Sequence, residues 1–472
     1  MAQNEYDLMV IGAGSGGLTA VEFAHKLGVR VALVEKHRLG GDCTWTGCVP
    51  SKALLHVAKV AHTARTAQAV GVSVGKPVVD MVQVRVTVQK AIADVYQHET
   101  PETLTAQGVD VFLGEAHFLD SHHVQVGESV LTAKKFVITT GAHPFIPPVP
   151  GLRDVPFLTY EQIFDNDRLP THLLILGAGA VGVEIAQAYA RLGAAVTLVD
   201  IAFLPAEEGD VGQLLQTILA GEGVNFVAGL ATAVSHTHNS FQLSVENQTT
   251  GKTETIQGDM LLVATGRRPN VAGLDLEMAG VAYSSKGIQV DDTLTTNVAH
   301  IFAAGDCIGG AQFTHLAGWQ AFTAVRNALL PGKSKGMPKV LPYTIFTEPE
   351  VAQVGLTAVA AQQQFGEGVT VLKQDLDRLD RAVVDQAQRG FIKIVVDENG
   401  RILGATIVAP RAGEMISEIS LTMQHNIKLR GLADAMRPYP TYSMGTQLLA
   451  ASQATDDFLN SIIGRLSLRF LR

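Results

Sequence analysis

The three cysteines of this chain include one closely spaced pair, Cys43 and Cys48, with four residues between them. The pair lies in a glycine-containing turn that leads into a helical pattern, and its spacing permits a small disulfide loop. So few cysteines in 472 residues cannot build the scaffold of a secreted protein, so a disulfide here is expected to be catalytic. Taken alone, the pair is equally compatible with two buried small side chains or with half of a metal site.

A glycine-rich turn near the N-terminus has the spacing that binds a pyrophosphate. Residues 6–11 (YDLMVI) predict a buried strand, and Gly12, Gly14 and Gly17 follow it as a GxGxxG pattern before a helical segment. The first glycine allows a tight turn, the second lets the backbone approach the phosphates, and the third permits close helix–strand packing. Glu35 ends the next predicted strand, where its carboxylate suits hydrogen bonds from a ribose diol.

The same pattern recurs later in the chain. Gly177, Gly179 and Gly182 follow a second strand-like run, and Asp200 ends the strand after the next helical segment. In both copies the acid stands 23 residues after the first glycine (35 − 12 and 200 − 177). Two matches with strand, helix and acid at one offset predict two dinucleotide-binding domains.

The acid of the second copy bears on which nicotinamide nucleotide is used. The Asp200 carboxylate would repel a 2′-phosphate and accept bonds from a 2′-hydroxyl, so NADH is expected. Arg267 and Arg268 could also reach this ribose, which leaves NADPH possible.

Four motifs follow one another along the chain: 40–52 (GGDCTWTGCVPSK), 264–270 (ATGRRPN), 303–306 (AAGD) and 347–357 (TEPEVAQVGLT). With these motifs and both glycine patterns, the sequence resembles the class I pyridine nucleotide–disulfide oxidoreductases, which include glutathione reductase, dihydrolipoyl dehydrogenase and mercuric reductase. The resemblance covers nearly the whole chain and implies an α/β fold with two Rossmann-like dinucleotide-binding domains plus a C-terminal α+β dimerisation domain. It also implies FAD and a nicotinamide nucleotide as cofactors, and a homodimer.

A chain of this length should contain about three domains. The resemblance implies that the FAD-binding domain is split around the other nucleotide-binding domain. The expected boundaries are 1–150 and 271–338 for the two parts of the FAD-binding domain, 151–270 for the NAD(P)-binding domain and 339–472 for the dimerisation domain.

By the same resemblance, Cys48 is the thiol that contacts the flavin and Cys43 the thiol that meets the substrate. Cys48 starts a predicted helix, whose dipole and free amides favour a thiolate. The resemblance pairs Lys52, one turn further on, with Glu184 in a buried ion pair beside the flavin. A surface ion pair is the alternative.

Asp306 is implied to bind the ribityl hydroxyls of FAD, and His315 to add a hydrogen bond near the flavin. A structural role for His315 is equally compatible with the sequence, and Cys307 is expected to be a small buried residue. The residues expected to bind the two cofactors are Gly12, Gly14, Gly17, Glu35, Lys36, Gly41, Asp42, Gly141, Asp306, His315, Gly177, Gly179, Gly182, Asp200 and Gly266.

The chain departs from the family pattern near its C-terminus. Disulfide-reducing members carry a His-Pro-Thr-x-Ser-Glu motif there, but this chain has Tyr439 in place of the histidine and Met444 in place of the glutamate. A phenol, with a pKa of about 10, cannot shuttle protons at neutral pH, so efficient turnover of glutathione disulfide or dihydrolipoamide is not expected. Mercuric reductases also have tyrosine here, but their C-terminal cysteine pair has no counterpart in this sequence.

We therefore expect an enzyme that passes electrons from NADH through FAD and the Cys43–Cys48 disulfide to an acceptor. The sequence leaves a disulfide, a quinone and a metal ion open as acceptors, and Tyr439 is kept as a candidate catalytic residue. The alternatives are a disulfide reductase of the glutathione reductase or dihydrolipoyl dehydrogenase type, and a redox-sensing flavoprotein with little turnover. No resident metal is expected.

Charge and hydropathy limit the partners. The formal net charge is −9, so the chain lacks the positive field that binds nucleic acid. It has no apolar run of about 18 residues and no room for a signal peptide, so a cytoplasmic protein is expected. Residues 457–472 form a basic amphipathic stretch, which is expected to pack at the dimer surface; docking on a membrane or a partner is the alternative.

Overall fold

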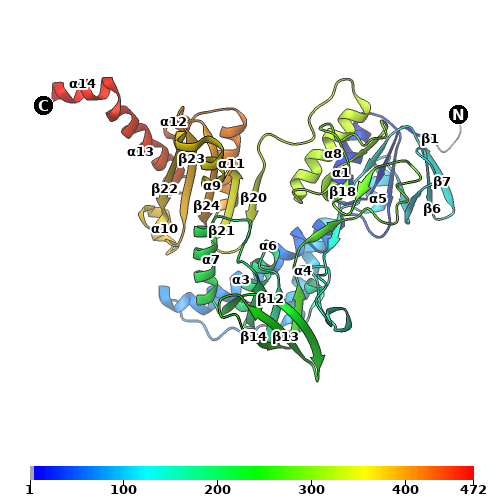
Figure 1. The fold of residues 1–472 in the computed structure, drawn as a ribbon, viewed down its shortest axis with the longest axis horizontal. Helices are drawn as coiled ribbons and strands as arrows, with labels where there is room; N and C mark the ends of the chain where they lie inside the picture. The colour runs from blue at the N-terminus through cyan, green and yellow to red at the C-terminus, as the bar shows by residue number, and fades with distance from the viewer. Residues whose placement is uncertain (1–4, 472) are drawn as a thin grey trace. The chain divides into compact units, whose positions relative to one another are not determined.

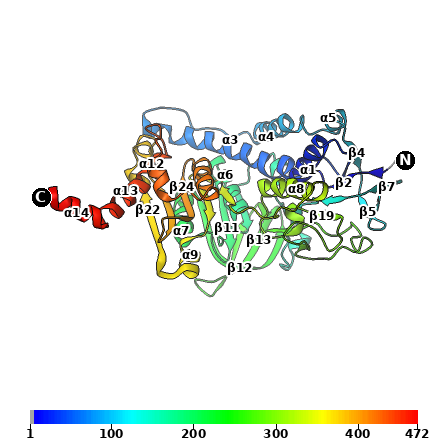
Figure 2. The same ribbon diagram turned by 90° about the horizontal axis from the view of Figure 1, so that it is seen from above.

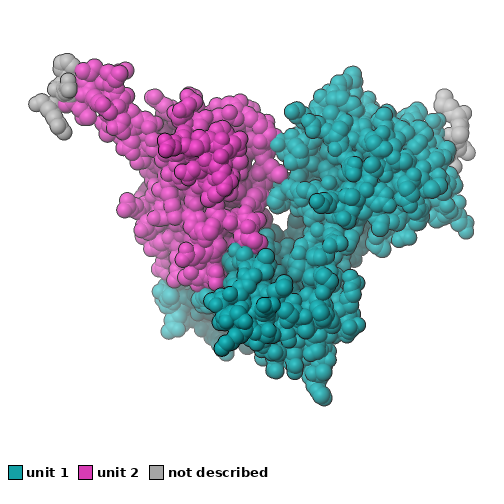
Figure 3. Space-filling model, in the orientation of Figure 1, with its two compact units in different colours: residues 1–203, 220–338 teal, residues 204–219, 339–472 magenta. Residues whose placement is uncertain are grey.

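The computed structural model describes the backbone of residues 5–471 (Figures 1 and 2). It divides into two compact units (Figure 3). Unit 1 comprises residues 1–203 and 220–338, and unit 2 comprises residues 204–219 and 339–472. The expected domain boundaries remain predictions, but residues 204–219, which were assigned to the NAD(P)-binding domain, group with the C-terminal part of the chain.

The first parallel sheet of unit 1 is built from strands that are distant in the sequence. It has five strands in the order β19-β8-β2-β3-β4, so β19, the last of these five in the sequence, pairs with β8 to complete the sheet. The segment between β8 and β19 is an insertion, as the split FAD-binding domain implied. The strands are β2 (Leu8–Ile11), β3 (Val31–Glu35), β4 (Asp110–Leu113), β8 (Phe136–Ile138) and β19 (Ile301–Ala303).

Strand β2 is apolar on both faces because both faces are covered. Leu8 and Val10 pack into one core with helices α1 (Ser15–Lys26) and α8 (Thr314–Leu329), which lie side by side. Met9 and Ile11 point the other way, into a core shared with a four-stranded sheet of order β1-β7-β6-β5. That sheet consists of β1 (Glu5–Tyr6), β5 (Ala116–Phe118), β6 (His123–Val126) and β7 (Ser129–Ala133).

The insertion contains the second copy of the glycine pattern. Its six-stranded sheet has the order β14-β13-β12-β11-β10-β15, with β15, β10, β11 and β12 parallel to one another. Helix α6 (Ala180–Leu192) follows the central strand β10, so strand, glycine turn and helix are consecutive. The strands are β10 (His172–Leu176), β11 (Ala195–Asp200), β12 (Val224–Thr237), β13 (Ser240–Asn247), β14 (Thr253–Gly258) and β15 (Met260–Val263).

Unit 2 contains an antiparallel sheet of order β20-β21-β24-β23-β22. One face of the sheet packs into an apolar core with helices α11 (Ala412–Gln424), α12 (Leu429–Asp434) and α13 (Met444–Asn460). The α/β class with an α+β C-terminal part is therefore confirmed. The strands are β20 (Pro342–Ile345), β21 (Glu350–Gly355), β22 (Val369–Asp375), β23 (Phe391–Asp397) and β24 (Ile402–Ala409).

The other face of this sheet carries a buried charge cluster that holds helix α7 (Gly209–Gly221). Lys393 of β23 lies 2.9 Å from a carboxylate oxygen of Glu208 and 2.9 Å from one of Asp210. Thr406 of the neighbouring strand β24 donates to Glu208 at 3.1 Å, and the backbone N–H of Ala358 donates to its other oxygen at 2.9 Å. Glu208 thus has partners for both oxygens, as a buried carboxylate requires.

No helix within residues 5–471 combines the length and hydrophobicity needed to cross a membrane.

Replacing Lys393 by alanine should destabilise unit 2 by roughly 3 kcal/mol, because it removes the cation from the buried carboxylate of Glu208. Lys373→Ala is the matched control: Lys373 is 43% exposed and lies 3.5 Å from Asp210, so its loss should cost less than about 1 kcal/mol. Thermal unfolding followed by circular dichroism measures both. Equal shifts in Tm for the two variants would contradict the stabilising role of the buried Lys393–Glu208 pair.

Candidate functional site

The first glycine turn allows no side chain at two of its positions. Gly12 has φ +99°, and a Cβ there would lie 2.6 Å from the carbonyl oxygen of Thr139. A Cβ on Gly17 would lie 1.9 Å from the carbonyl oxygen of Gly12, because helix α1 crosses directly over the turn. No side chain caps α1 at Gly14, so its first N–H groups are available to an anion.

The second turn repeats this geometry. Gly177 has φ +108°, and a Cβ on Gly182 would lie 2.0 Å from the carbonyl oxygen of Gly177. Around Gly179, at the start of α6, a Cβ would meet no heavy atom within 4 Å. The middle glycine therefore leaves space, and the outer two are required by packing.

The acid of each copy also fastens its own glycine turn. Glu35 accepts hydrogen bonds from the N–H groups of Ala13 (2.8 Å) and His37 (2.9 Å). Asp200 accepts from the N–H groups of Ala178 and Ile201, both at 2.7 Å. The sequence suggested only a ribose-binding role for these acids, and the structure adds this second one.

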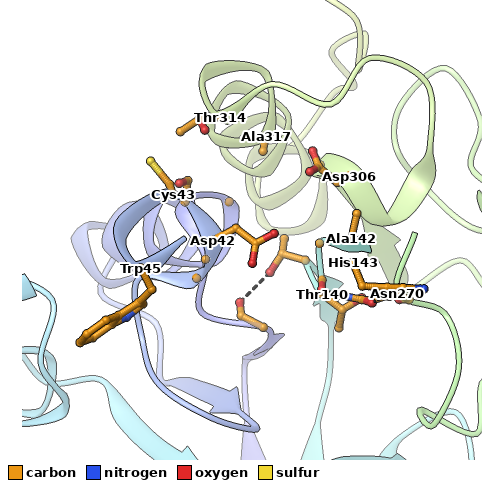
Figure 4. A pocket seen from close by; sticks show the side chains of 18 of the residues that line it. Asp42, Cys43, Trp45, Thr140, Ala142, His143, Asn270, Asp306, Thr314 and Ala317 are labelled. Atoms are coloured by element: carbon orange, nitrogen blue, oxygen red, sulfur yellow. Dashed lines mark hydrogen bonds between the residues drawn. The ribbon is translucent and has the colours of Figure 1, made fainter. Parts of the chain in front are cut away.

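A cavity of about 390 Å³ in unit 1 brings most of the expected FAD-binding residues together (Figure 4). Its walls come from the first glycine turn, the end of β3, the Cys43 segment, the segment after β8, and the start of α8. Gly17, Cys48 and His315 are not among its lining residues; His315 stacks on Phe313 with ring centroids 5.5 Å apart. The expected residues that line the cavity are Gly12, Gly14, Glu35, Lys36, Gly41, Asp42, Gly141 and Asp306.

The cysteine pair stands at one end of this cavity. Cys43 lies in α2 (Gly41–Trp45) and lines the cavity, whereas Cys48 is the first residue of α3 (Cys48–Thr66). Both cysteines are thiols in the structure. The hydroxyl of Thr314, another lining residue, lies 3.1 Å from Cys48 Sγ and can donate to a thiolate there.

The two thiols differ strongly in acidity. A hydrogen bond from Cys43, assisted by Thr314 and by the positive charge of Lys52, lowers the pKa of Cys48 to about 6. The same bond, together with burial, raises the pKa of Cys43. The reduced pair therefore holds one proton, on Cys43, and carries its negative charge on Cys48 at neutral pH.

The expected pairing of Lys52 with Glu184 is present. Lys52 Nζ lies 3.0 Å from Glu184 Oε2, which links α3 to α6. The carboxylate is buried and the lysine side chain is 38% exposed, so the pair is only half withdrawn from solvent. Its role beside the flavin stays a prediction.

Arg267 is the main site residue that the sequence did not reveal. It was considered for the nicotinamide ribose, but its guanidinium lies 2.5 Å from Asp42 and 2.9 Å from Asp306. It also donates to the hydroxyl of Tyr160 at 3.2 Å. Figure 4 shows Asp42 and Asp306 reaching into the cavity from different walls, so one arginine joins them. Burial raises the pKa of Asp306, and Arg267 opposes that shift.

A second set of lining residues that the sequence did not reveal is a hydrogen-bonded group around the segment that follows β8. His143 Nδ1 lies 2.7 Å from Asn270 Oδ1, and the Asn270 amide donates to the carbonyl of Thr140 at 2.8 Å. Asn270 ends the ATGRRPN motif, so that motif was the available signal for this group.

The residues present fit a flavin dinucleotide. The uncapped start of α1 suits the pyrophosphate, and Gly141, at φ +70°, has no atom within 4 Å of where its Cβ would stand. Within residues 5–471, no cluster of three or more His, Cys, Asp or Glu side chains is arranged to hold a metal ion.

Comparison with known families agrees with this geometry. Residues 6–321 match the model of the pyridine nucleotide-disulphide oxidoreductases, and residues 341–449 match the dimerisation domain of the same family. The chain belongs to this family. Its members are FAD-containing oxidoreductases that use NAD(P)H.

Three relatives within the oxidoreductase family illustrate its range. A mercuric reductase of Staphylococcus aureus is 32% identical over 94% of this chain and 82% of its own length. A dihydrolipoyl dehydrogenase of Thermus scotoductus is 34% identical over 95% of this chain and 97% of its own. The Cu(II) complex of the HOCl-induced flavoprotein disulfide reductase RclA from Escherichia coli has a TM-score of 0.84 and 30% identity, covering 95% of this chain and all of that one.

The position of the family's catalytic histidine lies in unit 2. There Tyr439 is 69% exposed and donates its hydroxyl proton to Asp380 Oδ2 at 2.8 Å. This hydrogen bond raises the pKa of Tyr439 above its usual value. Met444, in the glutamate's place, begins helix α13. The phenol is therefore a weaker acid than free tyrosine, and a proton-shuttling role for it is unfavourable.

Gly179→Ala and Gly182→Ala separate nucleotide binding from folding. Gly179→Ala should change the free energy of unfolding by less than about 0.5 kcal/mol. It should raise KM for NADH at least about tenfold, because the added methyl group occupies the space for the pyrophosphate. Gly182→Ala should lower stability by about 1–3 kcal/mol, since the methyl group collides with backbone. Differential scanning calorimetry and NADH kinetics test this. A large Tm loss in Gly179→Ala would contradict it.

Thr314→Val should raise the pKa of Cys48 by about one unit, because the thiolate loses a hydrogen bond. In the reduced holoenzyme the thiolate forms as pH rises through about 6, so the long-wavelength absorbance between this thiolate and the flavin should follow that titration. Thr314→Ser keeps the hydroxyl and should retain the original profile. Identical profiles for the valine and serine variants would show that this hydroxyl does not stabilise the thiolate.

Proposed function

We propose that the protein is a homodimeric, FAD-dependent NADH oxidoreductase that uses the Cys43–Cys48 pair to reduce a thiophilic metal ion. The observation that carries the proposal is the pair itself, in which Cys48 is a stabilised thiolate beside a cavity suited to FAD. The absence of an imidazole at position 439 then favours an acceptor that needs no proton from the protein.

The uncapped start of α1, Glu35 and Asp306 would hold FAD, which would supply two-electron chemistry between NADH and the Cys43–Cys48 disulfide. The residues of the chain organise the remaining steps. Thr314 and Lys52 hold the negative charge on Cys48, and Cys43 keeps the single proton of the reduced pair. Cys43 then meets the acceptor, as the family resemblance implies.

The proton balance favours a metal ion over a disulfide. Reducing a disulfide to two thiols consumes two protons, one for each leaving sulfur. Reducing Hg(II) to Hg(0), or two Cu(II) to Cu(I), consumes two electrons and no proton, while the proton of Cys43 is released as the disulfide re-forms. Soft thiolates also bind such ions directly. A mercuric reductase and a Cu(II)-binding reductase among the relatives support this class of acceptor.

The choice of NADH rests on Asp200. Its carboxylate is held at the end of β11 by two backbone N–H groups, which keeps a negative charge where a 2′-phosphate would have to lie. Arg267 is engaged by Asp42 and Asp306, which weakens the case for it as a phosphate-binding cation.

An anaerobic NADH titration of the holoenzyme, followed by a panel of acceptors, tests the proposal. Steady NADH oxidation is expected with Hg(II) or Cu(II), and Cys43→Ser and Cys48→Ser should each abolish it while retaining FAD. Cys48→Ser should also lose the long-wavelength absorbance that appears on reduction. Metal reduction that survives both substitutions would refute the role of the pair, and reduction of the pair without turnover on any acceptor would favour a redox sensor.

Restoring the family's proton donor should change the acceptor range. The double variant Tyr439→His/Met444→Glu is expected to gain at least about 100-fold in kcat/KM for glutathione disulfide or lipoamide, the usual worth of a general acid. Tyr439→Phe is the matched control and should leave metal reduction and the low disulfide activity unchanged. If Tyr439→Phe lost metal reduction, the phenol itself would be required.

A further inference from the structure

Helix α14 (Ile462–Leu471) and the C-terminal half of α13 form an arm that leaves the body of unit 2. Helix α13 ends at Asn460, and helix α14 begins a new direction after Ser461, whose Oγ accepts the N–H of Gly464 at 3.0 Å. Both ribbon views show α14 extending beyond the sheet and helices of its unit (Figures 1 and 2). The match to the dimerisation domain ends at residue 449, so most of this arm lies beyond the shared fold.

One face of α14 is apolar and open to solvent. Ile462 is 79% exposed, Ile463 70% and Leu466 49%. The spacing of Ile462 and Leu466 places them one turn apart on one face, with Ile463 beside them. Phe458, at the end of α13, is also 52% exposed. Burying this group would remove several large apolar side chains from water.

The same segment is basic within an acidic protein. After Asp456 and Asp457, the sequence from residue 458 to residue 472 contains three arginines and no acidic residue, whereas the whole chain has a net charge of −9. Arginines interspersed with large apolar residues in a short helical segment are typical of helices that lie in the interface of an anionic bilayer.

A second copy of the chain is the other partner that could cover this apolar face, and the sequence alone favoured packing at the dimer surface. Symmetric pairing of this helix would bring two sets of arginines together, which charge repulsion disfavours. An anionic lipid surface instead complements the arginines and covers the apolar face at once.

We propose that α14 docks the protein on anionic membranes. The inference is independent of the electron acceptor. A short helix can suffice if the two α14 helices of a homodimer meet the same surface, because the second would then bind at high effective concentration. Docking would place a thiol-dependent reductase at a lipid surface without any spanning helix in the described chain.

The test is sedimentation of the full-length holoenzyme with vesicles of phosphatidylcholine, alone or mixed with phosphatidylglycerol. The protein should partition at least about tenfold more strongly onto the anionic vesicles, and high salt should remove most of that preference. Ile463→Gln/Leu466→Gln and Arg465→Gln should each lose binding at least about fivefold. Val359→Gln, which changes a 61%-exposed apolar residue on α9 (Ala358–Phe365), is the matched control.

NADH-dependent turnover in solution and light scattering complete the design. Turnover and dimer mass should be unchanged in every variant, which separates failure of docking from failure of the enzyme. Equal binding to neutral and anionic vesicles, or full binding by the α14 variants, would overturn the proposal. Conversion of the α14 variants to monomers would show instead that the apolar face of α14 packs against a second copy of the chain.

Discussion

The coupling between the thiols of Cys43 and Cys48 sets the charge state of this site, because each thiol affects the ionisation of the other. It lowers the pKa of Cys48 and raises that of Cys43. That asymmetry requires a fixed geometry, which the chain obtains by placing Cys43 in the short helix α2 and Cys48 at the start of α3. Thr314, from a segment 266 residues away, then reaches the same sulfur. The first glycine turn and its sheet hold these parts around one cavity.

Arg267 pairs with the two carboxylates that line the cavity. Asp42 directly precedes Cys43, and Asp306 lies on another wall. Charged groups withdrawn from water need a counter-charge. Arg267 binds both carboxylates and also donates a hydrogen bond to the hydroxyl of Tyr160. The cavity thus keeps both acids fixed for polar recognition.

The sequence predicted those features that depend on neighbouring residues. Gly12, Gly17, Gly177 and Gly182 were recognisable because a turn between strand and helix tolerates no Cβ there, and the chain itself brings the contacting atoms together. The pairing of Lys52 with Glu184 spans 132 residues and came only from family resemblance. The contact of Arg267 with Asp42 spans 225 residues, and no local pattern encodes it. The cluster of Lys393 with Glu208 was missed for the same reason, and with it the grouping of 204–219 with the C-terminal sheet.

In the proposed function, Tyr439 and Met444, which replace the family's histidine and glutamate, redirect a shared fold to another acceptor. The Tyr439 hydroxyl is bound to Asp380, which raises its pKa and makes proton release less favourable. A site whose only mobile proton is the one on Cys43 cannot supply the two protons that disulfide reduction consumes, unless water delivers them slowly. The same site loses nothing when the acceptor takes electrons alone. The proposed change of acceptor would therefore leave the cysteine pair and both nucleotide sites as the family has them, because it alters the proton donor.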